Sequence, residues 1–419
     1  MTIPTLILDM GGGSLKIGFS TDSEPKVVDN CIFKSKTLSG RTFIGNEIEQ
    51  CNNLSSLFCV MPFKKGYINN WEVQSQILDT AFKSVFKTNS NFSLSDHNLI
   101  VTEPYFNFSS TKEAMNEVFF EDYQVAGLMR TNPAFLSAYK YRIESAQRLS
   151  RYCMVIDSGY SFTHIVPMAD GLVMKEFVMR LTVGGKILTN RLIEAVSYRH
   201  LDVRSEIYIM NQCKEDTCYV SVDFWKDMNI SSRSKPKSNS ILREYVLPNY
   251  VDVHRGYVRD PNTEAAKTGG SDKLDQRALS LAQQGYILRL NNERFTVPEL
   301  LFHPSDVGYK EMGLTEAIQH IMCERLPAAV RPGAWANFMV MGGNACFPGF
   351  TERLRKDLRT QAPDDLPVNI FKPPNPQTYA WEGGVLLCQN SESFNQFLVT
   401  RKEYEEQGSS YCEKRFPTT

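Results

Sequence analysis

Hydrophobic and polar positions near the N-terminus follow a pattern that predicts two strands joined by a tight turn. Residues 6–8 are apolar and lead to Asp9, and three glycines, Gly11, Gly12 and Gly13, follow. Residues 14–19 then alternate apolar with polar or small side chains, which is typical of a half-buried strand. Glycines let backbone N–H groups surround an anion, and a carboxylate at a strand end can hold a hydrated magnesium ion. An ordinary glycine hairpin has the same pattern, so this stretch alone leaves both interpretations open.

The same order of residue types occurs again in the middle of the chain. Residues 154–156 are apolar and lead to Asp157, Ser158 and Gly159 form a small-residue turn, and residues 162–166 have the pattern of a second strand. Such a repeat indicates a duplicated architecture. Two hairpins of this kind facing one another would hold a phosphate chain and its metal ion from both sides. The pair is therefore more specific than either copy.

A third glycine turn follows an apolar strand in the last quarter of the chain. Residues 338–341 are hydrophobic, Gly342, Gly343 and Asn344 come next, and a helical pattern follows. Backbone donors at a strand-to-helix junction suit the sugar or phosphates of a nucleotide. A glycine pair is common in turns, so this motif has weight only beside the other two.

The segments between these turns predict an α/β fold. Helix starts are expected at Asn70, which suits an N-cap, at Ser110, which begins a capping-box sequence, and at Pro133. A further helix is expected from Gly185. Residues 218–220 have the pattern of a strand. Two polar segments, 227–240 and 256–284, are poor in large apolar side chains and are predicted to be surface loops.

Composition limits the class of protein. The 419 residues, 42% hydrophobic and 22% charged, fit a soluble globular chain of two lobes. The net charge of -1 argues against a strongly basic nucleic-acid binder. Ten cysteines without a CxxC pair predict free thiols in a reducing compartment, cytosol or nucleus, and not a zinc site. We find no signal-peptide pattern and no apolar run that could cross a bilayer.

The three turns resemble the nucleotide loops of actin. Residues 8–19 and 157–164 are similar to its two phosphate loops, and residues 341–349 are similar to its third nucleotide loop. The resemblance extends from residue 6 to residue 416, interrupted at the polar segments. It is closer still for a nuclear class of actin-related proteins, through five stretches at residues 62–67, 102–108, 157–164, 292–295 and 379–384.

The resemblance implies two duplicated α/β lobes of the ribonuclease H-like kind around a cleft that holds ATP (or ADP) and magnesium. Residues 1–150 would form the first lobe, rejoined by residues 375–419, and residues 151–374 would form the second. Asp9 and Asp157 would hold magnesium through water. The nucleotide-facing residues would be Gly11, Gly12, Gly13, Ser14, Lys16, Ser158, Gly159 and Tyr160 near the phosphates, and Gly185, Lys214, Glu215, Gly342, Gly343 and Asn344 near the ribose and base. By themselves, Lys214 and Glu215 would suit a solvated ion pair equally well.

Departures from actin point away from catalysis. Pro133 stands where actin has a glutamine that helps to place the attacking water, and proline has no side-chain group to hold one. Tyr160 replaces an aspartate, Gly12 lacks a hydroxyl that actin has, and Gln377 with its neighbour replaces two residues beside the adenine. We therefore predict nucleotide binding without useful hydrolysis. Pro133 also suits an ordinary helix start, and both interpretations can hold together.

The resemblance further implies a role in an assembly. Residues 31–43 are too short to hold the long loop with which actin docks on the next subunit, which predicts that the chain does not polymerise. The class implies a non-catalytic subunit of a Swr-type nuclear chromatin remodeller that exchanges histone dimers. Its partners would be the motor subunit and a small zinc-finger subunit, with nucleosomal DNA or histones as further candidates and no membrane. Trp71, Tyr105 and Phe106 could contact partners, although core packing is the alternative for each. An active ATPase or sugar-kinase relative and a cytoplasmic filament component are the competing hypotheses.

Overall fold

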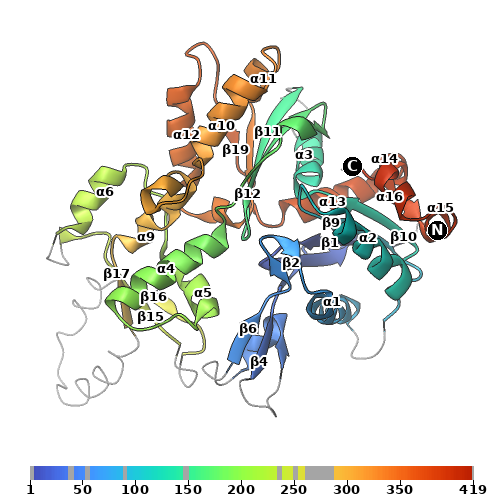
Figure 1. Ribbon diagram of the computed structural model, residues 1–419, viewed down its shortest axis with the longest axis horizontal. Helices are drawn as coiled ribbons and strands as arrows, with labels where there is room; N and C mark the ends of the chain where they lie inside the picture. Colours follow the sequence, from blue (N-terminus) through green and yellow to red (C-terminus); the bar gives the residue numbers. More distant parts are fainter. Residues whose placement is uncertain are drawn as a thin grey trace.

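The computed structural model describes residues 4–35, 42–51, 57–87, 92–144, 151–233, 238–248, 253–259 and 287–417 (Figure 1). Two six-stranded sheets form the centres of its two halves. Within the described ranges, no helix combines the length and the apolar character that a membrane span requires.

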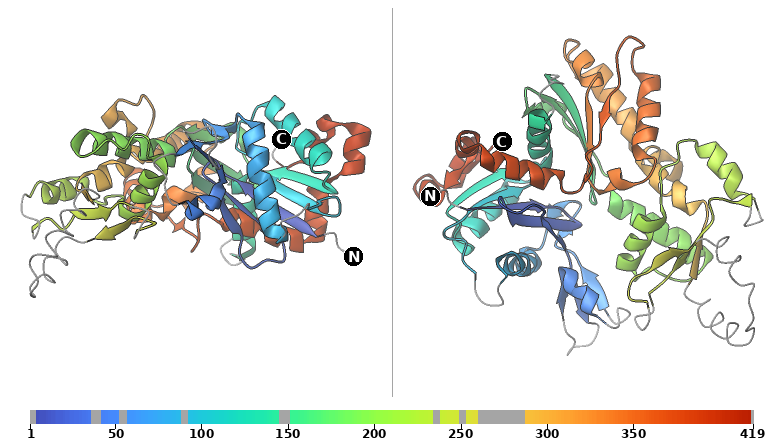
Figure 2. Two further views of the ribbon diagram at one scale, coloured as in Figure 1. Left: turned by 90° about the horizontal axis from the view of Figure 1, so that it is seen from below. Right: turned by 180° about the vertical axis from the view of Figure 1, so that it is seen from behind.

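The first sheet contains the predicted N-terminal hairpin and has the order β20-β10-β9-β1-β2-β3. Its strands are β1 (Thr5–Met10), β2 (Ser14–Phe19), β3 (Lys26–Asp29), β9 (Asn98–Thr102), β10 (Gly127–Thr131) and β20 (Val399–Thr400). β1 pairs antiparallel with β2 and parallel with β9, which in turn pairs parallel with β10. The C-terminal segment returns to this half, because β20 pairs with β10 and the last helices lie beside it (Figure 2).

The second sheet repeats this arrangement around the second predicted hairpin. Its order is β13-β12-β11-β18-β19, with β14 also paired to β12. The strands are β11 (Tyr152–Ser158), β12 (Thr163–Ala169), β13 (Leu172–Val173), β14 (Met179–Leu181), β18 (Phe338–Met341) and β19 (Ile370–Phe371). β11 and β12 are antiparallel, while β18 and β19 continue in parallel from β11. The shared order of hairpin and two parallel strands confirms the duplicated α/β architecture.

Two helices, α3 (Pro133–Glu144) and α13 (Tyr379–Gln389), connect the cores of the two halves. Leu136 and Trp381 pack with Ile7 of the first sheet, whereas Ala134 and Tyr379 pack with Val155 of the second. The two helices lie very close together, since a Cβ atom on Gly383 would be 2.1 Å from the carbonyl oxygen of Leu136. Any side chain at that position would separate the helices.

The outer faces of the sheets are covered by separate sets of helices. α1 (Trp71–Phe86) packs in the core of the first half, and α4 (Gly185–Arg199) and α5 (Ile207–Thr217) pack in the core of the second. Three small sheets extend the halves. One contains β4 (Ile32–Ser35), β5 (Phe43–Ile44) and β6 (Leu57–Val60), and a second contains β7 (Phe63–Lys64) and β8 (Tyr67–Ile68). The third contains β15 (Arg243–Val246), β16 (Tyr257–Arg259) and β17 (Ile287–Leu290). The remaining α-helices are α2 (Ser109–Glu117), α6 (Phe224–Ser231), α9 (Glu293–Thr296), α10 (Leu314–His320), α11 (Arg331–Trp335), α12 (Phe350–Gln361), α14 (Ser391–Phe397), α15 (Arg401–Gln407) and α16 (Ser409–Arg415). Shorter 3-10 and π turns lie at Gly45–Gln50, Val118–Asp122, Lys175–Phe177, Pro298–Leu301, Pro304–Val307, Ile321–Arg325 and Gly343–Cys346.

Helix starts were predicted with mixed success. Asn70 caps α1, since its Oδ1 accepts a hydrogen bond of 3.0 Å from the Val73 N–H, and Pro133 is the first residue of α3. The capping box at Ser110 is wrong. The N-cap of α2 lies two residues earlier, at Phe108, which makes no side-chain cap.

Two predictions in the second half are also wrong. Residues 218–220 are extended but form no strand, because their N–H groups bond to isolated carbonyls: Tyr219 donates to Arg294 and Val220 donates to Pro348. The segment 227–240 is not all loop, since α6 extends to Ser231 and begins at an N-cap formed by Asp223. In the segment 256–284, Tyr257–Arg259 is a strand, and residues 260–284 lie outside the described ranges.

Candidate functional site

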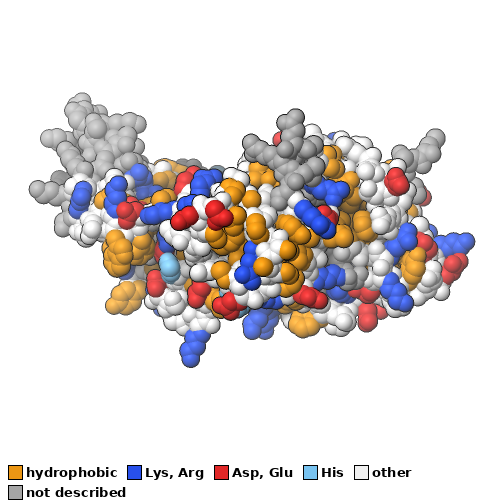
Figure 3. Space-filling view, turned by 90° about the horizontal axis from the view of Figure 1, so that it is seen from above, with side chains coloured by type: hydrophobic (Ala, Val, Ile, Leu, Met, Phe, Trp, Pro, Cys, Tyr) orange, Lys and Arg blue, Asp and Glu red, His pale blue; other side chains and the backbone are white. Residues whose placement is uncertain are grey.

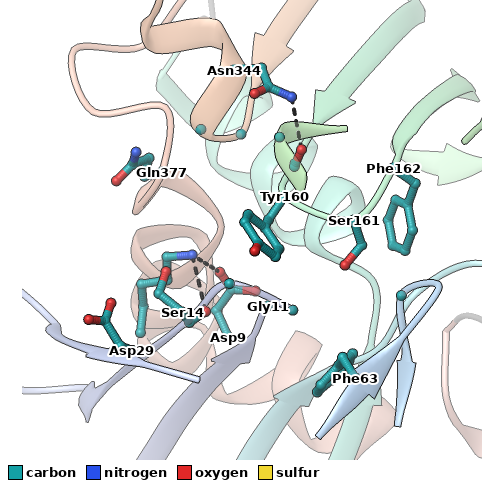
Figure 4. Close-up of a pocket in the computed structure, with 18 of the residues that line it drawn as sticks. Asp9, Gly11, Ser14, Asp29, Phe63, Tyr160, Ser161, Phe162, Asn344 and Gln377 are labelled. Carbon is teal, nitrogen blue, oxygen red and sulfur yellow. Dashed lines mark hydrogen bonds and ion pairs between the residues drawn. The ribbon is translucent and has the colours of Figure 1, made fainter. Parts of the chain in front are cut away.

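A cavity of about 460 Å³ lies between the two halves, where the tips of the two hairpins approach each other (Figure 4). With the exception of Ser158, every residue predicted to face a nucleotide lines this cavity: Asp9, Gly11, Gly12, Gly13, Ser14, Lys16, Asp157, Gly159, Tyr160, Gly185, Lys214, Glu215, Gly342, Gly343 and Asn344. Pro133 and Gln377 line it as well. The tertiary structure thus brings together residues that are more than 300 positions apart in the sequence.

Asp9 is fixed at the end of β1 by two neighbours. Its Oδ1 accepts a hydrogen bond of 2.7 Å from the Thr102 hydroxyl, and its Oδ2 lies 3.7 Å from the Lys16 ammonium. Lys16 is opposite Asp9 in the β1–β2 register, so the hairpin itself sets this ion pair (Figure 4). The carboxylate is therefore held at the cavity wall with its charge only partly balanced.

The glycine turn has its carbonyls bound on one side. Asn30 donates from Nδ2 to the Gly11 carbonyl at 2.9 Å and from its backbone N–H to the Gly13 carbonyl at 3.0 Å. Among the described residues, the N–H groups of Gly11, Gly12 and Gly13 have no hydrogen-bond acceptor. Free N–H groups in a glycine turn are the donors that an anion requires.

The second turn is held in a similar way by the start of α4. The Gly159 carbonyl accepts from the Gly185 N–H at 3.0 Å, and the Tyr160 carbonyl accepts from the Lys186 N–H at 2.8 Å. The N–H groups of Tyr160 and Ser161 find no acceptor in the described part of the chain. Both hairpins therefore present unpaired backbone donors to one cavity.

Ser158 lies behind the cavity wall and is hydrogen-bonded to Asn344, which lines the cavity. The Ser158 hydroxyl is fully buried, lies 2.8 Å from the Thr163 hydroxyl and accepts from Asn344 Nδ2 at 3.1 Å. The same amide group donates to the Gly159 carbonyl at 2.8 Å. These bonds fix the third glycine turn to the second, which corrects the prediction that Ser158 faces the ligand.

Lys214 lines the cavity, and its side chain is also held inside the protein. Its buried ammonium donates to the Gly185 carbonyl at 3.2 Å, to the Thr189 hydroxyl at 3.0 Å and to Asn211 Oδ1 at 2.8 Å. An ammonium group has three donors, and all three are used within the protein. Lys214 therefore fixes α5 to α4, and Glu215 is left to face the cavity from the last turn of α5.

Asp157 and Asp9 are two carboxylates at one cavity, and this pair favours a bound cation. Burial, and after it the negative charge of Asp9, raise the pKa of Asp157 to about 7, against the opposing effect of Lys16. Two carboxylates at such a site are stabilised by a cation, and oxygen ligands suit magnesium. The donor set therefore fits a magnesium ion held with its hydration water.

Contacts between the two halves cross the cavity beside the small β4–β6 sheet. The Tyr208 ring of α5 meets the Phe33 ring of β4 edge-on at 5.2 Å, and the Asp29 carboxylate lies close enough to the Tyr208 hydroxyl to help raise its pKa, after burial. Tyr160 donates from its hydroxyl to Met61 Sδ at 3.7 Å. We call these five residues the bridge. No local pattern predicts the bridge, because its members pair only through tertiary packing.

His164 is a cavity residue to which we gave no role from the sequence. It is 1% exposed, lies 4.2 Å from the Phe162 ring and 5.2 Å from the Tyr105 ring, and its Nε2 has no hydrogen-bond partner among the described residues. Burial, followed by the charge of Arg180, lowers its pKa to about 3. The imidazole is therefore neutral at physiological pH.

This shift predicts a loss of stability in mild acid. Below pH 6.5 the unfolded chain gains a proton at His164 that the folded chain does not take up, so the free energy of unfolding should fall by about 2 kcal/mol between pH 7.5 and pH 5. Denaturant titrations of the natural chain and of His164→Phe should differ by this pH-dependent amount. His254→Gln, at an exposed histidine, should keep the full pH response. Parallel pH profiles for the natural chain and His164→Phe would contradict the assignment.

A duplicated pair of α/β halves around a cavity, each with a carboxylate-tipped hairpin, is the architecture of actin-like proteins. The family model described as Actin matches residues 1–207 and 199–417. The chain therefore belongs to the actin family.

The chain is 40% identical to actin-related protein 6 of Drosophila melanogaster, over 97% of this chain and 98% of that protein. It is 36% identical to actin-like protein ARP6 of Cryptococcus neoformans, over 99% and 85% of the two chains, and 33% identical to actin-related protein 6 of Oryza sativa subsp. indica, over 98% of each. Within the family, it groups with actin-related protein 6, in agreement with the class that the sequence resembles.

Proposed function

We propose that this chain is a nucleotide-binding, non-catalytic subunit of a Swr-type nuclear chromatin remodeller. The observation that carries nucleotide binding is the shared cavity, into which both hairpins present a carboxylate and unpaired N–H groups. Asp9 and Asp157 would hold hydrated magnesium, and the two turns would hold the phosphates of ATP or ADP. A ligand bound across both halves would stabilise the fold by linkage.

Hydrolysis is expected to be poor because the cavity wall at the start of α3 is Pro133, which offers no hydrogen bond to a water molecule. Phosphate release by the purified protein tests this, and we expect none above a no-protein control. One observation favours the alternative, an active ATPase: the neutral His164 lines the cavity with a free ring nitrogen. Phosphate release that His164→Phe abolishes would establish that alternative.

Polymerisation is not expected. β4 and β5 pair directly through Phe33 and Phe43, so a short connection joins them, and its residues 36–41 lie outside the described ranges. A salt-induced sedimentation assay with actin as the positive control tests this point. Pelleting of the natural chain would favour the filament hypothesis.

The assignment to a remodeller rests on the class of the chain and needs a direct test. Tyr105 is buried in the core and Trp71 is partly buried, whereas Phe106 is 56% exposed and is the most accessible of the three candidate aromatics. Positive and negative side chains are interspersed over the face drawn in Figure 3, which suits protein partners better than a DNA backbone. Affinity capture from nuclear extract followed by mass spectrometry should recover the motor and zinc-finger subunits. Recovery of no remodeller subunit would contradict the proposal.

The bridge predicts slow nucleotide exchange. Tyr208→Ala removes the ring contact with Phe33 and the polar neighbour of Asp29, so release of a fluorescent ATP analogue in a chase experiment should be about tenfold faster. Tyr198→Ala, at a tyrosine of α4 that is 92% exposed, is the matched control and should leave the rate unchanged. Equal release rates for Tyr208→Ala and the natural chain would show that the bridge does not limit exchange.

A further inference from the structure

Ser161 lies at the tip of the second hairpin, and its hydroxyl group reaches across to the first. A Cβ atom built on Gly12 would lie 2.3 Å from Ser161 Oγ, so the hydroxyl occupies the space directly above the Gly12 backbone. Ser161 lines the cavity, and its hydroxyl has no hydrogen-bond partner among the described residues (Figure 4). A polar group is thus presented, without a partner, between two sets of unpaired N–H groups.

The backbone that carries this hydroxyl is tightly held. A Cβ atom on Gly184 would lie 2.7 Å from the Ser161 carbonyl carbon, which places the start of α4 directly against the turn. On the other side, a Cβ atom on Gly66 would be 2.1 Å from the Phe162 ring. Since both flanks are in close contact with the turn, Ser161 can move little apart from rotation of its own side chain.

A side chain at Gly12 is incompatible with the observed orientation of the Ser161 hydroxyl. A methyl group at Gly12 would lie 2.3 Å from Ser161 Oγ, so the Ser161 side chain would have to rotate away. The first turn therefore lacks a side chain at the position where the second turn supplies a hydroxyl. This explains why the absence of a hydroxyl at Gly12, noted in the sequence, need not remove a polar contact from the cavity.

We propose that Ser161 is a phosphate-contacting residue, whose hydroxyl donates a hydrogen bond to the phosphate chain held between the two glycine turns. This inference rests on the proposed nucleotide binding. The hydroxyl lies above the first glycine turn, and N–H groups of both turns have no acceptor among the described residues, so a phosphate oxygen is the acceptor that the surroundings favour. Ser161 would then add a side-chain contact to a cradle otherwise made of backbone donors.

Binding of magnesium ATP to a small set of variants tests the inference. Loss of one hydrogen bond to a charged oxygen should raise the Kd of Ser161→Ala about tenfold. Gly12→Ala should also bind more weakly, because its methyl group collides with the hydroxyl. The double variant Gly12→Ser/Ser161→Gly transfers the hydroxyl to the opposite turn and should return the Kd to within about threefold of the natural value. Ser305→Ala, at an exposed serine outside the cavity, should bind like the natural chain.

The outcomes separate the inference from the function on which it rests. If the natural chain binds magnesium ATP and Ser161→Ala binds it equally well, the Ser161 contact is wrong and nucleotide binding stands. If the natural chain itself does not bind, both are overturned. The double variant Gly12→Ser/Ser161→Gly could instead bind magnesium ATP as weakly as Ser161→Ala while its melting temperature without nucleotide is unchanged. That result would contradict the inference that a hydroxyl on either turn reaches the same phosphate oxygen.

Discussion

Asp157→Asn should bind magnesium ATP at least a hundredfold more weakly than the natural chain, a loss of about 2.8 kcal/mol. The substitution keeps the shape of the side chain and removes one of the two charges that the cavity offers to a hydrated cation. Because the pKa of Asp157 is about 7 in the empty cavity, binding should be compared at pH 8, where the natural carboxyl group is ionised. Isothermal titration calorimetry at fixed magnesium concentration gives the two affinities.

The sign of the effect should reverse when magnesium is chelated. Without the cation, Asp157 repels the phosphates, so the asparagine variant should bind metal-free ATP more tightly than the natural chain, by about threefold. Asp170→Asn, at an exposed aspartate paired with Arg151, should change neither affinity. An equal loss of affinity with and without magnesium would indicate structural damage and would contradict a metal-holding role.

Arg130→Leu should lower the free energy of unfolding by about 3–5 kcal/mol, because it leaves a buried carboxylate without its partner. Arg130 is 0% exposed, and its Nη1 lies 3.5 Å from Oε2 of Glu103, which is 2% exposed and lines the cavity. The same guanidinium pairs with Glu413 of α16 and lies 5.1 Å from the Phe416 ring. Arg130 therefore ties the C-terminal helix to the wall of the candidate site, and chemical denaturation measures the cost of losing it.

Two further variants show which interaction is responsible for the lower free energy of unfolding of Arg130→Leu. Glu413→Gln removes only the partly exposed partner and should destabilise by about 1 kcal/mol. The double variant Arg130→Leu/Glu103→Leu removes both buried charges and should recover most of the loss, since an apolar pair needs no compensation. A double variant as unstable as Arg130→Leu alone would mean that packing, and not the unpaired carboxylate, sets the penalty.

Local chemistry explains which predictions from the sequence succeeded. Asp9 and Asp157 each lie at the end of an apolar strand, a small-residue turn follows, and an alternating segment comes after it, a local pattern that predicts a hairpin. The helix starts at Asn70 and Pro133 succeeded because capping and proline preferences act within one turn. The capping box at Ser110 failed because α2 begins at Ser109, so Ser110 lies inside the first turn and cannot cap it. The strand predicted at residues 218–220 failed because a strand needs a neighbour, and no local pattern specifies one.

The sequence by itself determined the two hairpins, the duplicated α/β class and the membership of the actin family, because these depend on residue types at short spacing and on end-to-end similarity. Only the tertiary structure decided that all three N–H donors of Lys214 are bound within the protein. It also decided that the Tyr208 ring contacts the Phe33 ring and that the Ser161 hydroxyl lies above Gly12. Each of these contacts joins segments that are distant in sequence, and its geometry depends on how the two halves pack. Distances between such segments are set by the whole core, and no local pattern encodes them.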